Sequence, residues 1–202
     1  MTADRGARPS REALLALLLL MAAVPAWAHE QTGQAAGFLT GLKHPVSGLD
    51  HVLAMISVGL WGAQLGAPAV WLLPVVFPLV MAFGGFLGLV GVPLPGTEIG
   101  IAVSAILLGL MVAFEARPPV WVAAGLVGFF GIFHGYAHGT ELPAGENALL
   151  YSVGFVIATG GLHAIGIAIG IAHRWSPGRI AVRVAGGAVA IAGVYFLWGA
   201  VS

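Results

Sequence analysis

The sequence predicts an all-α polytopic membrane protein with six transmembrane helices after a cleavable signal peptide. Of its 202 residues, 59% are hydrophobic and only 8% are charged, whereas an average soluble domain has about 25% charged residues. Several apolar stretches reach the roughly 18 to 20 residues that a helix needs to cross a lipid bilayer. Clusters of proline and glycine separate these stretches, as expected for turns between helices.

The first 28 residues, 1–28, have the pattern of a secretory signal peptide. Three arginines precede the short apolar run ALLALLLLMAAV, and AWA at residues 26–28 is a cleavage motif of the A-x-A type. The alternative is an uncleaved transmembrane helix, although the apolar run is shorter than a span requires. Cleavage would leave His29 at the mature N-terminus. Its amine and imidazole could collect a metal ion there; the alternative is that this end of the chain is disordered.

The rest of the chain, residues 29–202, is predicted to form a single six-helix transmembrane domain. The predicted helices cover residues 48–65, 70–90, 98–114, 120–135, 148–171 and 180–201. A signal peptide would deliver the N-terminus to the outside, so the connections after the first, third and fifth helices would face the cytoplasm. Four arginines lie in these connections and in the first turn of the last helix, whereas Lys43 is the one basic residue among the outer segments. The positive-inside rule therefore favours this orientation, with the mature N-terminus outside. We expect a multi-pass protein of the bacterial inner membrane, in which this N-terminus would be periplasmic.

The stretch HPVSGLDH places His44, Asp50 and His51 immediately before and at the start of the first predicted helix. Ionisable groups at membrane depth are costly and usually functional, which favours a metal site over a polar helix cap. On a straight helix the Cα atoms of the two histidines would be ~10.5 Å apart, near the limit for sharing one ion. Pro45 and Gly48 permit a broken first turn, so we expect either such a break or two successive sites. Asp50 could bind the ion or orient a neighbouring imidazole.

The stretch FHGYAHGTELP contains a second cluster of candidate ligands. His134 and His138 are four residues apart and Glu141 follows three residues later, so a helix would present all three on one face. Two imidazoles at this spacing can bind one divalent ion, but the glutamate that follows the first histidine in zinc proteases is replaced by Gly135. The chain has no cysteine, which leaves mainly nitrogen and oxygen ligands. Both clusters are predicted at outer helix ends, so we expect them to meet.

Two further ionisable residues are candidates. Glu98 opens the third predicted helix on the same outer side, where it could complete an anionic site or serve as an ordinary N-terminal helix signal. His163 lies in the middle of the fifth predicted helix. It could be a relay station for an ion that crosses the bilayer, or a histidine that hydrogen-bonds to a neighbouring helix.

These motifs resemble those of the HupE/UreJ family of nickel permeases. HPVSGLDHVLAMISVGLW is similar to the family pattern H-P-x-x-G-x-D-H-x-L-A-M, and FHGYAHGTELP is similar to its second histidine motif. The resemblance implies a secondary permease that takes up Ni²⁺, with Co²⁺ as a second candidate, to supply hydrogenase or urease maturation. It implies functional roles for six residues of the two motifs: His44, Asp50, His51, His134, His138 and Glu141. Glu98 is a further candidate.

The composition of the sequence also indicates which binding partners to expect and which to exclude. It has no G-x-x-x-x-G-K-[ST] motif, and Lys43 is its only lysine, so we expect no ATP hydrolysis. Net charge is zero and basic residues are scattered, which argues against nucleic acid as a partner. The expected partners are a divalent metal ion, as transported substrate, and the lipid bilayer. No cofactor is required.

Two other functional classes compete with the permease. In a membrane-embedded zinc hydrolase, three histidines and an aspartate would hold zinc with an open position for water, and Glu141 would act as base. In a haem-binding membrane subunit, histidines on two helices would face each other as paired axial ligands. A hydrolase should retain its ion during purification, whereas a permease should bind it reversibly.

Overall fold

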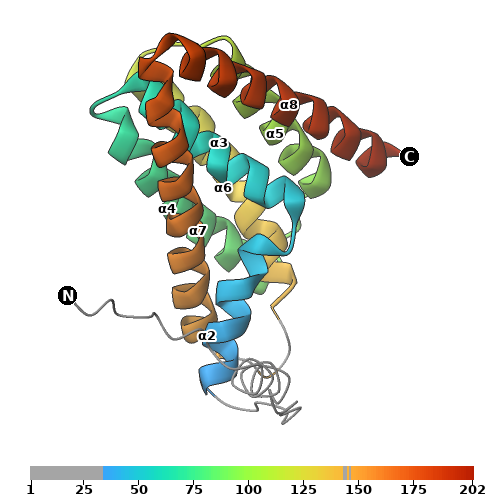
Figure 1. Ribbon diagram of the computed structural model, residues 1–202. Coiled ribbons are helices and arrows are strands. Elements are labelled where there is room, and N and C mark those ends of the chain that lie inside the picture. Colours follow the sequence, from blue (N-terminus) through green and yellow to red (C-terminus); the bar gives the residue numbers. More distant parts are fainter. Residues whose placement is uncertain (1–33, 143–144, 146) are drawn as a thin grey trace, which may run out of the picture. The chain divides into compact units, whose positions relative to one another are not determined.

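The computed structural model describes residues 34–142, 145 and 147–202, and the predicted signal peptide and His29 lie outside these residues. The described chain is helical and contains no strand. Its elements in chain order are α2 (Gln34–Lys43), the 3-10 helix η1 (His44–Val46), α3 (Leu49–Leu65), α4 (Ala69–Leu89), α5 (Thr97–Ala113), α6 (Val120–Thr140), α7 (Ala148–Gly170), the 3-10 helix η2 (Ile171–Arg174) and α8 (Ser176–Val201) (Figure 1).

Each of the six predicted helices has a counterpart, from α3 to α8, but some predicted ends were wrong. The prediction ended the fourth helix at residue 135, whereas α6 continues to Thr140 because its late glycines pack against α4 instead of breaking the helix. The prediction began the last helix at residue 180, whereas α8 begins at Ser176 with Pro177 in its first turn, where proline suits a helix. The short helix α2 was not predicted.

Four segments are long and apolar enough to cross a membrane: Ala69–Leu89, Val120–Thr140, Ala148–Arg174 and Ser176–Val201. The bent pair Gly37–Val46 and Leu49–Leu65 would make a fifth if it forms one span. Helix α5 is apolar but shorter, at 17 residues. These helices are typical of a multi-pass membrane protein, and the count of six spans stays a prediction.

Close backbone packing holds the helices that carry the histidines. Helix α4 packs on α6, α5 on α8, and both α2 and α3 on α7. On α6, a Cβ atom added to Gly135 or Gly139 would meet main-chain atoms of α4. These glycines therefore allow the two backbones to approach closely, as small residues do between helices in membranes. Since His134 and His138 each directly precede one of them, this tight packing fixes where both histidines emerge from α6.

The expected break in the first motif is present. The chain bends by 78° between Gly37–Val46 and Leu49–Leu65, and α2 and α3 can be followed on the two sides of this bend in Figure 1. Gly48 lies at the bend in an extended conformation, as the residue directly before α3. A Cβ atom here would come within 2.8 Å of Asp50 Oδ1 and 3.1 Å of His51 Nδ1. Glycine therefore leaves room for the aspartate and the histidine to meet.

Candidate metal site

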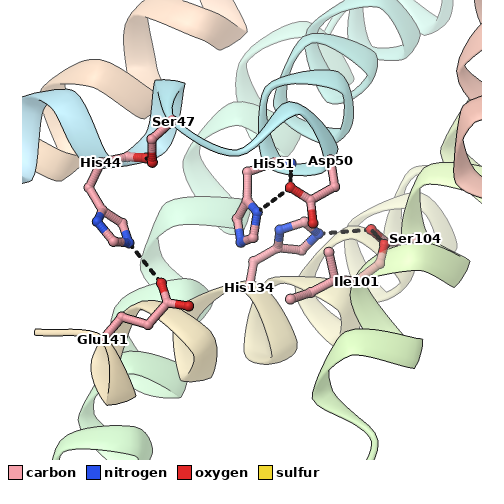
Figure 2. Close-up of polar contacts among 8 residues, drawn as sticks. All are labelled: His44, Ser47, Asp50, His51, Ile101, Ser104, His134 and Glu141. Carbon is pink, nitrogen blue, oxygen red and sulfur yellow. Dashed lines mark hydrogen bonds and ion pairs between the residues drawn. The ribbon is translucent and has the colours of Figure 1, made fainter. Parts of the chain in front are cut away.

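The two motifs meet where α3 begins and α6 ends. His44, at the start of η1, lies with its Nε2 atom 3.0 Å from Oε2 of Glu141, which directly follows α6 (Figure 2). The ring of His138 lies 4.7 Å from that of His44, measured between centroids. One ligand atom from each of these three residues lies within 4.8 Å of the other two. Two imidazoles and a carboxylate suit nickel, cobalt, zinc or copper.

Two more histidines extend this group into the protein. The ring of His51 lies 4.4 Å from that of His138 and 4.7 Å from that of His134. The four rings thus form a continuous line in the order His44, His138, His51 and His134. The side chain of His44, at one end of this line, is 20% exposed. His134, at the other end, is fully buried. The line therefore leads from the surface to the interior, and His44 and His51 are linked through His138.

Asp50 orients His51. Its Oδ1 atom lies 2.9 Å from His51 Nδ1 and accepts a hydrogen bond of 2.8 Å from the His51 main-chain N–H (Figure 2). A carboxylate only accepts, so Nδ1 carries the proton and Nε2 of the neutral ring carries the lone pair. Within the described part of the chain, Nε2 is buried and has no hydrogen-bond partner. The pair therefore matches the carboxylate–histidine arrangement that presents an imidazole to a metal.

Ser104 orients the ring of His134 in a similar way. Its hydroxyl donates a hydrogen bond of 2.6 Å to the Ile101 carbonyl, and its oxygen lies 2.8 Å from His134 Nε2 (Figure 2). Because the single hydroxyl proton is used by Ile101, His134 Nε2–H must donate to Ser104. The lone pair is then on Nδ1, which is buried and lacks a partner among the described residues. The sequence did not identify Ser104, since a lone serine in an apolar helix commonly bonds only its own backbone.

Replacing Ser104 by alanine should weaken metal binding. The change removes the acceptor that fixes the His134 tautomer, and loss of such an orienting partner typically lowers metal affinity about 10-fold or more. Isothermal titration of the purified protein with Ni²⁺ measures the effect. Ser152→Ala is the matched control, because the Ser152 hydroxyl is exposed and bonds to the Ala148 carbonyl. Equal affinities for Ser104→Ala and wild type would contradict the orienting role.

Glu98 lies apart from the group of His44, His138 and Glu141. It is in the first turn of α5 and lines a cavity of about 350 Å³ together with Asp50 and aromatic residues of α8. The structure thus brings Glu98 and Asp50 to one cavity beside the line of histidines. Two carboxylates in one cavity favour the local accumulation of cations.

His163 is also separate from the line. It is buried in the middle of α7, and its ring contacts Phe77 instead of another histidine, at a centroid distance of 5.5 Å. The remaining described histidine, His173, lies in η2 at the other end of α7, where Nδ1 is 2.7 Å from the Gly170 carbonyl oxygen.

Comparison with known proteins gives a match over most of the chain. The family model described as "HupE / UreJ protein" matches residues 16–196. Protein HupE of Rhizobium leguminosarum bv. viciae is 49% identical over 178 residues, which cover 88% of this chain and 93% of that protein. No solved structure gives a significant match. The chain belongs to the HupE/UreJ family.

Proposed function

We propose that this chain is a secondary permease that takes up Ni²⁺, with Co²⁺ as a second substrate, across the inner membrane. Membership of a family associated with nickel and cobalt transport supports this function. The observation that carries it is the line of four imidazoles from surface to interior, with several ring nitrogens that have no partner among the described residues. The metal taken up would supply hydrogenase or urease maturation.

The line begins with capture of the ion. The end of the bundle that holds Glu141 and His44 faces the periplasm in this proposal, as the distribution of arginines favours. A hydrated cation exchanges some of its water for the carboxylate and for the imidazoles of His44 and His138. The hydrogen bond between His44 and Glu141 is then broken, and the proton on His44 Nε2 moves to Nδ1 or to water. Both nitrogens of His138 are buried without a partner in the described chain, so the nitrogen that carries the lone pair is available to the ion.

Transfer then proceeds along neighbouring rings. The Nε2 atom of His51 and the Nδ1 atom of His134 are the lone-pair nitrogens that Asp50 and Ser104 leave free. Adjacent ring centroids are 4.4 to 4.7 Å apart, so an ion can gain a new ligand before it loses the previous one. Several weak sites in series allow both entry and release, which one tight cage would prevent.

The membrane potential is sufficient to drive uptake. A divalent cation that crosses an inside-negative membrane gains about 4.6 kcal/mol per 100 mV, twice the value for one charge. At about 1.4 kcal/mol per tenfold change, this corresponds to more than a thousandfold accumulation. Hydrolysis of ATP is therefore not needed.

The geometry favours the permease over its two rivals. The zinc hydrolase would need three histidines and an aspartate on one ion, with Glu141 free to act as base. Here Glu141 belongs with His44 and His138 to the group whose ligand atoms converge, and Asp50 pairs with His51 instead. A haem needs a gap between its two axial histidines. Here successive rings contact one another directly, at 4.4 to 4.7 Å between centroids.

Uptake by reconstituted protein tests the proposal. The full chain is placed in liposomes, an inside-negative potential is imposed, and entry of radioactive nickel is measured for wild type, His51→Ala and the control His173→Ala. We expect wild type and His173→Ala to accumulate nickel and His51→Ala to lose most of this uptake. Entry that equals that of empty liposomes, or equal entry for wild type and His51→Ala, would contradict the proposal. Competition by cobalt and zinc then measures selectivity.

A further inference from the structure

His163 is a buried imidazole with no hydrogen bond in the described part of the chain. It is 1% exposed, and neither of its ring nitrogens has a partner there. A buried polar group that lacks a partner costs about 1 to 3 kcal/mol. A neutral imidazole carries its proton on one nitrogen and a lone pair on the other. Because neither nitrogen makes a well-formed hydrogen bond among the described residues, the lone-pair nitrogen is available to a cation.

A main-chain carbonyl beside His163 also lacks its usual partner. In a regular helix the carbonyl of residue 74 accepts a hydrogen bond from the N–H of residue 78, but residue 78 is a proline and has no N–H. This Pro74 carbonyl lies close to the His163 imidazole and interacts with it, but the two groups do not have the geometry of a well-formed hydrogen bond. In transporters, carbonyl groups freed by irregular helices coordinate cations. A carbonyl oxygen and an imidazole therefore lie near each other in the interior of the helix bundle.

This pair lies one aromatic ring beyond the line of histidines. The ring of Phe77, on α4, is 5.4 Å from the ring of His134 and 5.5 Å from the ring of His163, measured between centroids. Phe77 is fully buried. One turn before His163 on α7, the buried hydroxyl of Thr159 is also without a partner in the described chain. Polar groups thus continue inward from His134.

We propose that His163 and the Pro74 carbonyl form a second, deeper binding station for the transported divalent cation. The ion reaches this station from His134, past the Phe77 side chain, and water molecules complete its ligand shell there. The inference rests on the proposed permease function. It requires that His163 serve translocation and not capture, because the group of His44, His138 and Glu141 is complete without it.

Separate measurement of capture and translocation tests the station. His163→Leu replaces the imidazole by an apolar side chain of similar size, and His173→Leu makes the same change at a histidine outside the line. Ni²⁺ binding is measured on each purified full-length variant by isothermal titration, and potential-driven uptake is measured in liposomes. We expect His163→Leu to bind Ni²⁺ as wild type does but to lose at least about tenfold in uptake rate, a barrier increase of about 1.4 kcal/mol. His173→Leu should retain both.

Each other outcome has a distinct meaning. Uptake by His163→Leu at the wild-type rate would overturn the station and leave the permease function intact. Loss of both binding and uptake in His163→Leu would assign His163 a structural role and overturn the station. Absence of uptake by wild-type protein would overturn the permease function, and the station with it.

Discussion

Alanine at position 138 is expected to lower Ni²⁺ affinity by more than about 100-fold, beyond the range that loss of an orienting residue produces. His138 lies between His44 and His51 in the line of histidines and contacts both rings. Both of its nitrogens are buried and lack partners within the described residues. His138→Ala therefore removes a ligand from the entry group and also the link to the next imidazole. Isothermal titration and liposome uptake should both show the loss.

The control for this variant is His173→Ala, which removes an imidazole at the other end of α7. Because His138 also packs against Phe155, with ring centroids 4.4 Å apart, thermal unfolding of each variant should be measured alongside binding. A folded His138→Ala protein with wild-type Ni²⁺ affinity would show that the ion binds elsewhere.

The second large effect is expected for Asp50→Asn. The change keeps the size of the side chain but removes the negative charge that holds the proton on His51 Nδ1. An amide can also donate a hydrogen bond, which would move the ring proton to Nε2 and block the atom that should bind the ion. We expect Ni²⁺ affinity to fall about 10- to 100-fold.

Titration with Ni²⁺ and nitrogen NMR of the His51 ring test this explanation together. Wild type should show a protonated Nδ1, and Asp50→Asn should show a changed tautomer with the lower affinity. Glu115→Gln is the control, because Glu115 lies just beyond the C-terminal end of α5 and is paired with Arg179 of α8 (3.1 Å). Unchanged affinity in Asp50→Asn would refute the orienting role of the aspartate.

Much of the helical fold could be predicted because each long apolar run has its own local signal. Helix α2 could not. It has ten residues, two of them glycine, and it is stabilised by contacts distant in sequence, such as Gly41 against the backbone of Tyr151. The end of α6 was predicted too early for a similar reason. Gly135 and Gly139 weaken a helix locally, but contact with α4 compensates for this.

That the two histidine motifs come together could be predicted, but the order of their side chains in space could not. The two histidine motifs stand out in an apolar sequence, and their positions at helix ends indicated that they would meet. The placement of His138 between His44 and His51 depends on the 78° bend before α3 and on the close approach of α6 to α4. Neither can be read from spacing. Ser104 is recognisable only through the hydrogen bond that links α5 to α6.

The central claim is that imidazoles from both motifs bind the transported ion along one path. X-ray absorption at the nickel edge tests this claim most directly. Nickel-loaded wild-type protein should show a shell of nitrogen and oxygen ligands with outer scattering from imidazole, since the chain has no cysteine. The imidazole contribution should decrease in His44→Ala, from the first motif, and in His138→Ala, from the second. A spectrum of the hydrated ion in wild type, or an imidazole contribution that neither variant changes, would contradict the account.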